Sequence, residues 1–120
     1  MIMKRLYSIT LPLPPSVNSA YGGGSGQRRF KSATYKRWLL KCPAVTDRPK
    51  INTPICVAYN VWLPDNRLRD IANYEKLATD FLVNNEVLAD DNFKIIQQVV
   101  LNFIGIDKAN PRVEVVIKKI

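Results

Sequence analysis

The chain has 120 residues, 47% of them hydrophobic and 23% charged, which is typical of a folded domain and not of a disordered tail. It contains no histidine and only two cysteines, Cys42 and Cys56. A histidine-dependent triad is therefore excluded, and neither a zinc finger nor a disulfide scaffold is expected. The formal net charge of +8 favours a polyanionic partner. No apolar run approaches the roughly 20 residues that span a bilayer, so we expect a cytoplasmic protein.

The charge is distributed unevenly along the chain. Residues 1–64 carry ten lysines and arginines against one acid, whereas residues 65–120 carry eight against nine. This division suggests that one half attracts an anion and the other supplies carboxylates, although a basic half can equally be a solvated surface.

The first half predicts a strand, a basic loop and a helix. Residues 1–12 contain a strand-like run that ends at the prolines, and residues 16–19 indicate a turn. The glycine-rich segment 22–26 predicts a flexible loop, which we extend over the basic residues to about 21–31. Ser32 or Thr34 caps a helix that continues to about Cys42, with Tyr35, Trp38 and Leu39 as its apolar stripe. Residues 44–53 are expected to form a loop.

The second half predicts three strands and a longer helix. Residues 54–64 alternate at period two, as a half-buried strand does, and residues 68–84 show the spacing of an amphipathic helix. Residues 94–106 and 112–120 read as two strands, which we predict to form a hairpin. The chain is thus expected to be one α+β domain, residues 1–120, in the order β-α-β-α-β-β.

Acidic and polar residues gather at two points of the second half. Asp70, Asn73 and Lys76 fall at one end of the predicted helix, and the pair Asp90 and Asp91 follows the helix. Carboxylates converging from two elements suit Mg²⁺, which activates water and neutralises a phosphate under attack. The alternative is structural: Asp70 is a helix cap, and the aspartate pair is solvated.

Several segments together carry a family resemblance. They are Pro14-Pro15-Ser16-x-Asn18-x-x-Tyr21, Leu63-Pro64-Asp65, Arg69-Asp70-x-x-Asn73-x-x-Lys76, Leu88-x-Asp90-Asp91 and the basic C-terminal segment. In this order and at these spacings, the chain resembles the RusA-type Holliday junction resolvases of bacteria and their phages, over nearly its whole length.

The resemblance implies a mixed β-sheet packed by two main helices, and a homodimer that binds four-way DNA junctions and nicks two strands symmetrically. It implies Mg²⁺ as the metal, with Mn²⁺ as a substitute. The family's metal-binding acids correspond to Asp70, the position of Ala72 and Asp91, with Asp90 adjacent, and its catalytic lysine corresponds to Lys76. The expected location is the cytoplasm of a bacterial or phage-infected cell.

Ala72 departs from the family pattern, which has an aspartate there. Alanine supplies no ligand, so the site should hold Mg²⁺ more weakly and position water poorly. Because the surrounding motif is intact, we favour a deliberate aspartate-to-alanine substitution that inactivates the protein. The alternative is a natural homologue that binds branched DNA without cutting it.

The predicted DNA-binding surface centres on the basic loop. Cations there neutralise phosphates, and Phe30 either stacks at the branch point or packs on its own domain. The predicted set comprises Arg28, Arg29, Phe30, Lys31, Arg67, Arg69, Asn18 and Asn73. Lys36, Arg37 and Lys41 either extend this patch or form a solvated face, and Trp38 and Trp62 are expected to be core or dimer contacts. A weaker expectation is that the C-terminal strands and residues 87–104 dimerise. An RNA-binding module is a third possibility.

Overall fold

The computed structural model describes residues 3–23 and 29–120. Its main elements are β1 (Arg5–Pro12), α1 (Ala33–Lys41), β4 (Ile55–Leu63), α2 (Glu75–Asn84), β5 (Ile96–Ile106) and β6 (Arg112–Lys119). Two 3-10 turns, η1 (Val17–Ser19) and η2 (Ile71–Tyr74), and two short strands, β2 (Tyr21–Gly22) and β3 (Phe30–Lys31), complete the order. An α+β fold with a mixed sheet and two helices is confirmed.

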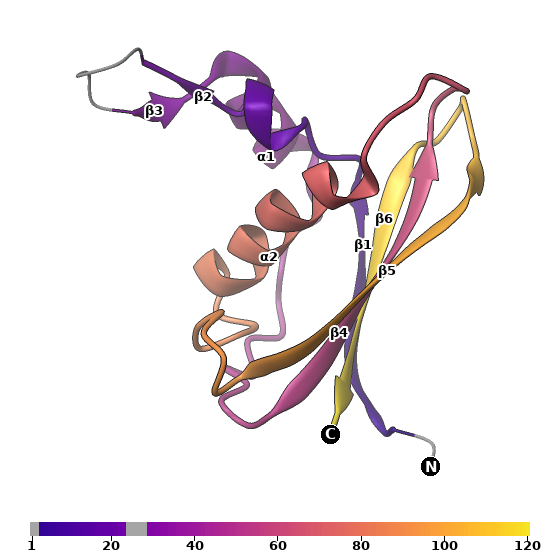
Figure 1. Cartoon of the computed structure of the whole chain (residues 1–120). Helices are drawn as coiled ribbons and strands as arrows, with labels where there is room; N and C mark the ends of the chain where they lie inside the picture. Colours follow the sequence, from indigo (N-terminus) through magenta and orange to yellow (C-terminus); the bar gives the residue numbers. More distant parts are fainter. Residues whose placement is uncertain (1–2, 24–28) are drawn as a thin grey trace.

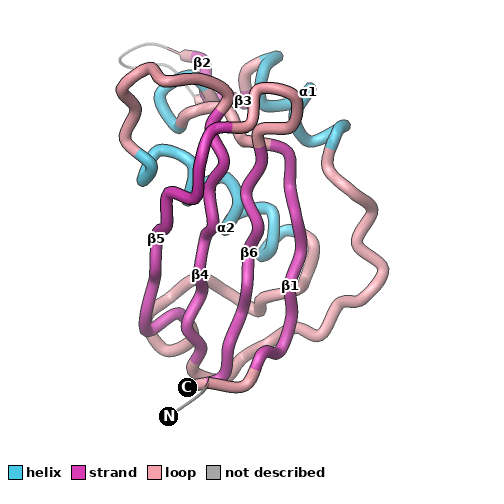
Figure 2. Tube along the Cα trace, turned by 90° about the vertical axis from the view of Figure 1, so that its right-hand side faces the viewer, coloured by secondary structure: helices cyan, strands magenta, loops and turns pink. Residues whose placement is uncertain are grey.

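The four long strands form one sheet in the order β1-β6-β4-β5, seen face-on in Figure 2. Strand β6 runs antiparallel to β1 and β4, whereas β4 and β5 are parallel. Parallel neighbours require a crossover connection, and α2 provides it. In Figure 1 both helices lie on the same side of the sheet, with α1 near its upper end.

The predicted hairpin of residues 95–106 and 112–120 is wrong, because β5 and β6 lie on opposite sides of β4. Strand β4 takes a central position since most of its side chains are buried. Strand β5 begins at Ile96 and includes the exposed Gln97 and Gln98, as suits an edge strand. The turn 107–111 therefore passes over the end of β4.

The core lies between the sheet and α2. The period-two prediction for β4 is confirmed, since Ile55, Val57, Tyr59 and Val61 are all fully buried. From α2, the buried side chains that pack in the same cluster are Leu77, Ala78, Phe81 and Leu82. The predicted apolar stripe of the second helix is thus confirmed in its α-helical part.

Helix α1 begins where the sequence predicts. Ser32 is its N-cap, and the Ser32 hydroxyl accepts a hydrogen bond from the Tyr35 backbone N–H at 3.1 Å. Tyr35 and Trp38 are buried, and Leu39 is partly buried against the same cluster. The indole N–H of Trp38 donates to the Pro12 carbonyl at 2.8 Å, which fastens α1 to the end of β1.

The second helix begins later than predicted. Residues 68–70 are not helical, η2 is a 3-10 turn, and regular α-helix starts only at Glu75. Asp70 occupies the N-cap position of η2 with an extended backbone, but its side chain makes no capping hydrogen bond, so it caps the turn only through its backbone carbonyl, which accepts the Asn73 N–H at 3.0 Å. An ion pair between Asp65 and Arg69 lies within the non-helical segment that precedes η2. A 3-10 turn keeps Ile71 and Tyr74 on one side, which is why the apolar spacing resembled a continuous helix.

Parts of the predicted basic loop, residues 24–28 with Arg28 among them, lie outside the described residues. Within residues 3–23 and 29–120, no helix has the length and apolar character needed to cross a bilayer.

Candidate active site and nucleic-acid interface

A pocket of about 580 Å³ opens where the chain leaves the carboxyl end of β4. Its lining combines Ser16, just before η1, with Leu68, Arg69, Asp70, Asn73 and Tyr74 around η2. Of the predicted site residues, Asp70, Asn73 and Arg69 therefore share one pocket. Ala72 is exposed within η2 and contributes no polar atom between Asp70 and Asn73.

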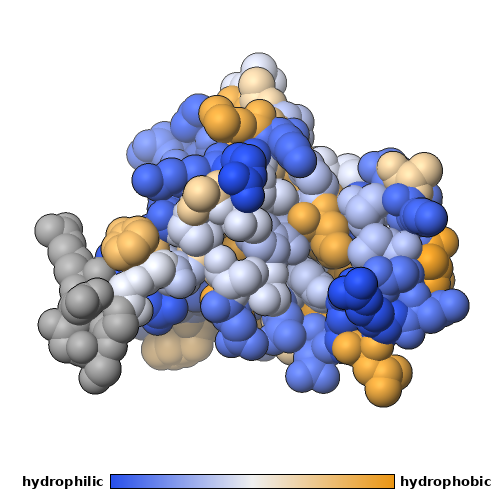
Figure 3. Space-filling model, turned by 90° about the horizontal axis from the view of Figure 1, so that it is seen from above, coloured by the Kyte–Doolittle hydropathy of each residue, from blue (hydrophilic) through white to orange (hydrophobic). Residues whose placement is uncertain are grey.

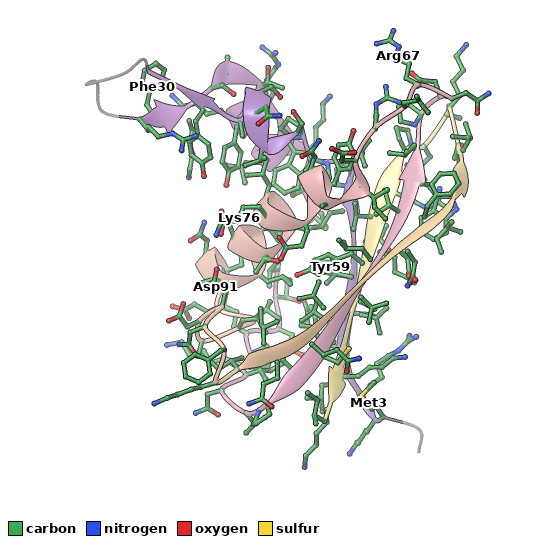
Figure 4. All side chains as sticks on the ribbon, viewed as in Figure 1. Met3, Phe30, Tyr59, Arg67, Lys76 and Asp91 are labelled. Atoms are coloured by element: carbon green, nitrogen blue, oxygen red, sulfur yellow. The ribbon has the colours of Figure 1, made fainter. Side chains whose placement is uncertain are left out.

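Lys76 lies in the first turn of α2, between two carboxylates. Its Nζ atom is 3.5 Å from Oδ2 of Asp91 and 3.1 Å from Oδ1 of Asp80. The hydrogen bond that Lys76 donates to Asp80 is the main cause that raises the pKa of Lys76, with a smaller contribution from Asp91. In Figure 4, Lys76 and Asp91 project on the side of α2 away from the sheet, whereas Tyr59 lies between α2 and the sheet.

Asp80 was missed by the sequence analysis. Its signal was available, because a lysine and an aspartate four residues apart on a helix are neighbours.

The loop that carries Asp90 and Asp91 is held by backbone hydrogen bonds to the segment at Ile51. Ile51 donates to the Val87 carbonyl, and the Ala89 N–H donates to the Ile51 carbonyl, both at 2.9 Å. The Asp90 carboxylate accepts the Asp91 backbone N–H at 2.8 Å and the Asn92 side-chain amide at 3.0 Å, which lowers the pKa of Asp90. The Asp90 carboxylate therefore forms hydrogen bonds within its own loop, and only Asp91 of the pair contacts Lys76.

A metal site requires several carboxylates close together. Within the described part of the chain, no three acidic or cysteine side chains are grouped closely enough to hold an ion. Asp70 lines the pocket beside η2, whereas Asp91 pairs with Lys76. Carboxylate oxygens are the right donors for Mg²⁺, but with Ala72 in place they do not form a complete ligand set.

A buried hydroxyl chain lies directly beneath this site. The Tyr59 hydroxyl is hydrogen-bonded to the Thr79 hydroxyl, and Thr79 donates to Oε1 of Glu75 at 2.9 Å. Tyr59 is fully buried, and burial is the largest cause that raises its pKa, with Glu75 and Asp91 adding to it. The sequence predicted Tyr59 as core but gave no sign of this partner, which only the packing of α2 on β4 supplies.

Arg69 forms an ion pair with Asp65, a residue that was not among the predicted site residues. Its guanidinium pairs with both carboxylate oxygens of Asp65, and the second contact is 3.1 Å long. Asp65 also accepts the Arg67 backbone N–H at 3.0 Å. The Arg69 hydrogen bond is the main cause that lowers the pKa of Asp65 to about 2. Arg67 and Arg69 both belong to the predicted DNA-binding set. Arg67 is the more exposed of the two, with 82% of its side chain accessible.

The predicted DNA-binding residues of the first half surround β2 and β3. Arg29 stacks on the Tyr21 ring with 4.6 Å between the guanidinium carbon and the ring centroid, and Lys31 lies 5.3 Å from the Tyr35 centroid. Phe30 is 59% exposed, and a side chain at Gly22 would collide with its ring.

Asn18 is exposed in η1, next to the Ser16 that lines the pocket. Figure 4 shows Phe30 and Arg67 on opposite sides of the upper end, and Figure 3 shows that this end is largely hydrophilic.

The exposed cations at one end of the molecule and the lysine beside an aspartate suit a protein that acts on the phosphates of DNA. Residues 12–118 match the family model described as Endodeoxyribonuclease RusA, so the chain belongs to the RusA family. Membership assigns it to nucleases that resolve Holliday junctions and generally depend on a divalent metal. No curated protein matches the chain.

Proposed function

We propose that this chain binds four-way DNA junctions and is a resolvase whose cutting step is impaired at position 72. Support comes from the family match over residues 12–118, from Lys76, which lies 3.5 Å from Asp91, and from the pocket that contains Asp70 and Asn73. In this proposal, Lys76 stabilises negative charge on the phosphate that water attacks.

The metal part of the proposal depends on restoring a carboxylate. We assign Asp70, Asp91 and Asp90 as ligands of Mg²⁺, with Mn²⁺ as a substitute, once an aspartate occupies position 72. Ala72 is exposed, so an aspartate there needs no burial of charge. In the chain as it stands, we expect binding without efficient nicking.

The DNA-binding part of the proposal uses the cations and amides of the upper end. Arg29, Lys31 and Arg67 are exposed and supply charge for phosphates, whereas Arg69 must first leave Asp65 to do so. Asn18 and Asn73 flank the pocket and are proposed as hydrogen-bonding contacts, and Phe30 as a stacking contact. Arg28 belongs to the same proposed set.

A symmetric assembly completes the proposal. Paired cuts in a two-fold junction require two equivalent sites, which a homodimer provides. We propose the cytoplasm, where recombining DNA is accessible, as its place of action.

The favoured alternative is a binder of branched DNA that never cuts, and its supporting observation is Ala72 itself. A first experiment measures binding of the chain to a four-way junction, to linear duplex DNA and to RNA of equal charge. The proposal predicts at least about tenfold tighter binding to the junction. Equal affinity for junction and duplex, or preference for RNA, would overturn it.

A further inference from the structure

A second pocket, of about 540 Å³, is lined in part by residues 12–15, which directly precede the Ser16 that lines the candidate active site. Its walls are residues 12–15 at the exit of β1, one face of α1, and residues 109–111 of the turn between β5 and β6. We call it the Trp38 groove. In Figures 1 and 2, the exit of β1, α1 and this turn all lie at the upper end of the molecule.

The groove is built on fixed walls. Trp38, only 4% exposed, lies at its base, and its indole N–H is already hydrogen-bonded to Pro12. Leu13 N–H donates to the Pro111 carbonyl at 3.1 Å, which ties the β1 exit to the turn. Arg112 anchors the same turn by donating to the Asn110 carbonyl at 2.9 Å. A preformed groove loses little entropy when a ligand binds.

The charged side chains that line the groove are all positive. Arg37 and Lys41, one helical turn apart on α1, are the charged residues of its lining, and both are exposed. Arg37 donates to the Thr34 hydroxyl at 3.3 Å, which steadies its guanidinium. Among the described residues, neither cation forms an ion pair with a carboxylate. The surface therefore complements a polyanion that also has an apolar face.

The groove and the candidate active site use consecutive residues of one segment. Residues 12–15 line the groove, and Ser16, the next residue, lines the pocket that holds Asp70 and Asn73. A ligand bound at both places would cross this segment between Pro15 and Ser16.

We propose that the Trp38 groove binds the phosphodiester backbone of the junction arm that continues from the cleaved phosphate, an inference that rests on the proposed function. Arg37 and Lys41 contact the phosphates, and the Pro12–Trp38 surface contacts sugars. An acidic peptide of a partner protein is the other class of ligand for such a surface. The two cations of the groove, unpaired among the described residues, and its position next in the chain to the Ser16 that lines the pocket, favour DNA.

The test compares two double variants with equal loss of charge. R37Q/K41Q neutralises the groove, and K4Q/K119Q neutralises two exposed lysines near the opposite end of the sheet. Junction affinity is measured for both and for the parent chain over a range of salt concentrations, with circular dichroism to verify folding. Each phosphate contact contributes about 0.9 to the slope of log affinity against log salt. R37Q/K41Q should therefore reduce the slope by about 1.8, and K4Q/K119Q should leave it unchanged.

The outcomes separate the two proposals. If the parent chain binds junction and duplex equally, the proposed function fails, whatever the variants do. If the parent prefers junctions but R37Q/K41Q keeps the parental slope, the groove does not contact DNA. A parental slope combined with weakened binding of a poly-glutamate peptide would assign the groove to an acidic protein segment, which also overturns the inference.

Discussion

The Lys76 ammonium lies 3.1 Å from the carboxylate of Asp80, one turn further along α2, and this contact is shorter than the 3.5 Å contact to Asp91. Asp80 therefore orients Lys76 from within its own helix, while Asp91 approaches from the loop. Both carboxylates favour the charged form of Lys76, and a charged lysine is what the proposed stabilisation of an anionic transition state needs.

Replacing Asp80 with asparagine should lower the pKa of Lys76, because the Asp80 hydrogen bond is the main cause that raises it. Because the pKa of Lys76 is raised in the folded protein, the Lys76–Asp80 pair stabilises the fold fully at pH values below the pKa of an unfolded lysine. This stabilisation is lost as the pH rises through the pKa of Lys76 in the folded protein. The pair is partly exposed, so its contribution is at most about 0.5 kcal/mol. A carbon-detected NMR titration of Lys76 measures the shift. Asp91→Asn is the control, and a larger shift in that variant would contradict the assignment.

Thr79→Val should destabilise the protein by about 1–3 kcal/mol, because it leaves the buried Tyr59 hydroxyl without a partner. Urea unfolding measures the change. The control is the double variant Y59F/T79V, which removes both hydroxyls and should cost less than the sum of the two single changes. Strict additivity would show that the two hydroxyls are not coupled.

The Asp65 carboxyl should titrate with a pKa of about 2, below the ordinary value of 3.8. A lowered pKa means that the Asp65–Arg69 pair stabilises the loop above pH 3.8 and that this is lost as pH falls through about 2. Arg69→Gln should raise the Asp65 midpoint, whereas Arg67→Gln, which keeps the backbone contact of residue 67, should raise it less. An NMR titration that finds an ordinary midpoint in the parent chain would refute the pairing.

Ser32→Ala should cost about 1 kcal/mol or more of stability, because the Ser32 hydroxyl caps α1 and also donates to the Ser19 carbonyl at 2.9 Å. The matched control is Thr34→Ala, at the other position that the sequence allowed as a cap, which should have a smaller effect. Thermal unfolding of both variants decides between the two positions.

Local patterns predicted much of the fold and little of the pairing between distant segments. The alternation in β4 and the cap at Ser32 were predictable because both depend on neighbours in sequence. The partners of β5 depend on which strand is buried most deeply, and the periodicity of residues 94–106 carries no such information. The start of α2 at Glu75 was missed because the 3-10 turn η2 has nearly the same apolar spacing as an α-helix.

The candidate site divides in the same way. Asp70, Asn73, Lys76 and Asp91 were proposed from sequence, and the structure brings Asp70 together with Asn73 and Lys76 together with Asp91. The contacts made by Asp65, Asp80 and the Tyr59–Thr79 pair were not predicted. The first two join residues four apart in the chain, whereas the Tyr59–Thr79 contact comes from packing between two elements.

We propose that position 72 alone separates this chain from an active resolvase. Nicking of a synthetic four-way junction in Mg²⁺ by the chain and by its Ala72→Asp variant, with Ala72→Asn as the uncharged control, tests this directly. We expect paired symmetric cuts by Ala72→Asp only, and a loss of about 10²–10³-fold when Lys76→Ala is added to it. If Ala72→Asp binds junctions over duplex but does not cut, the chain is a structure-specific binder and the catalytic assignments are wrong.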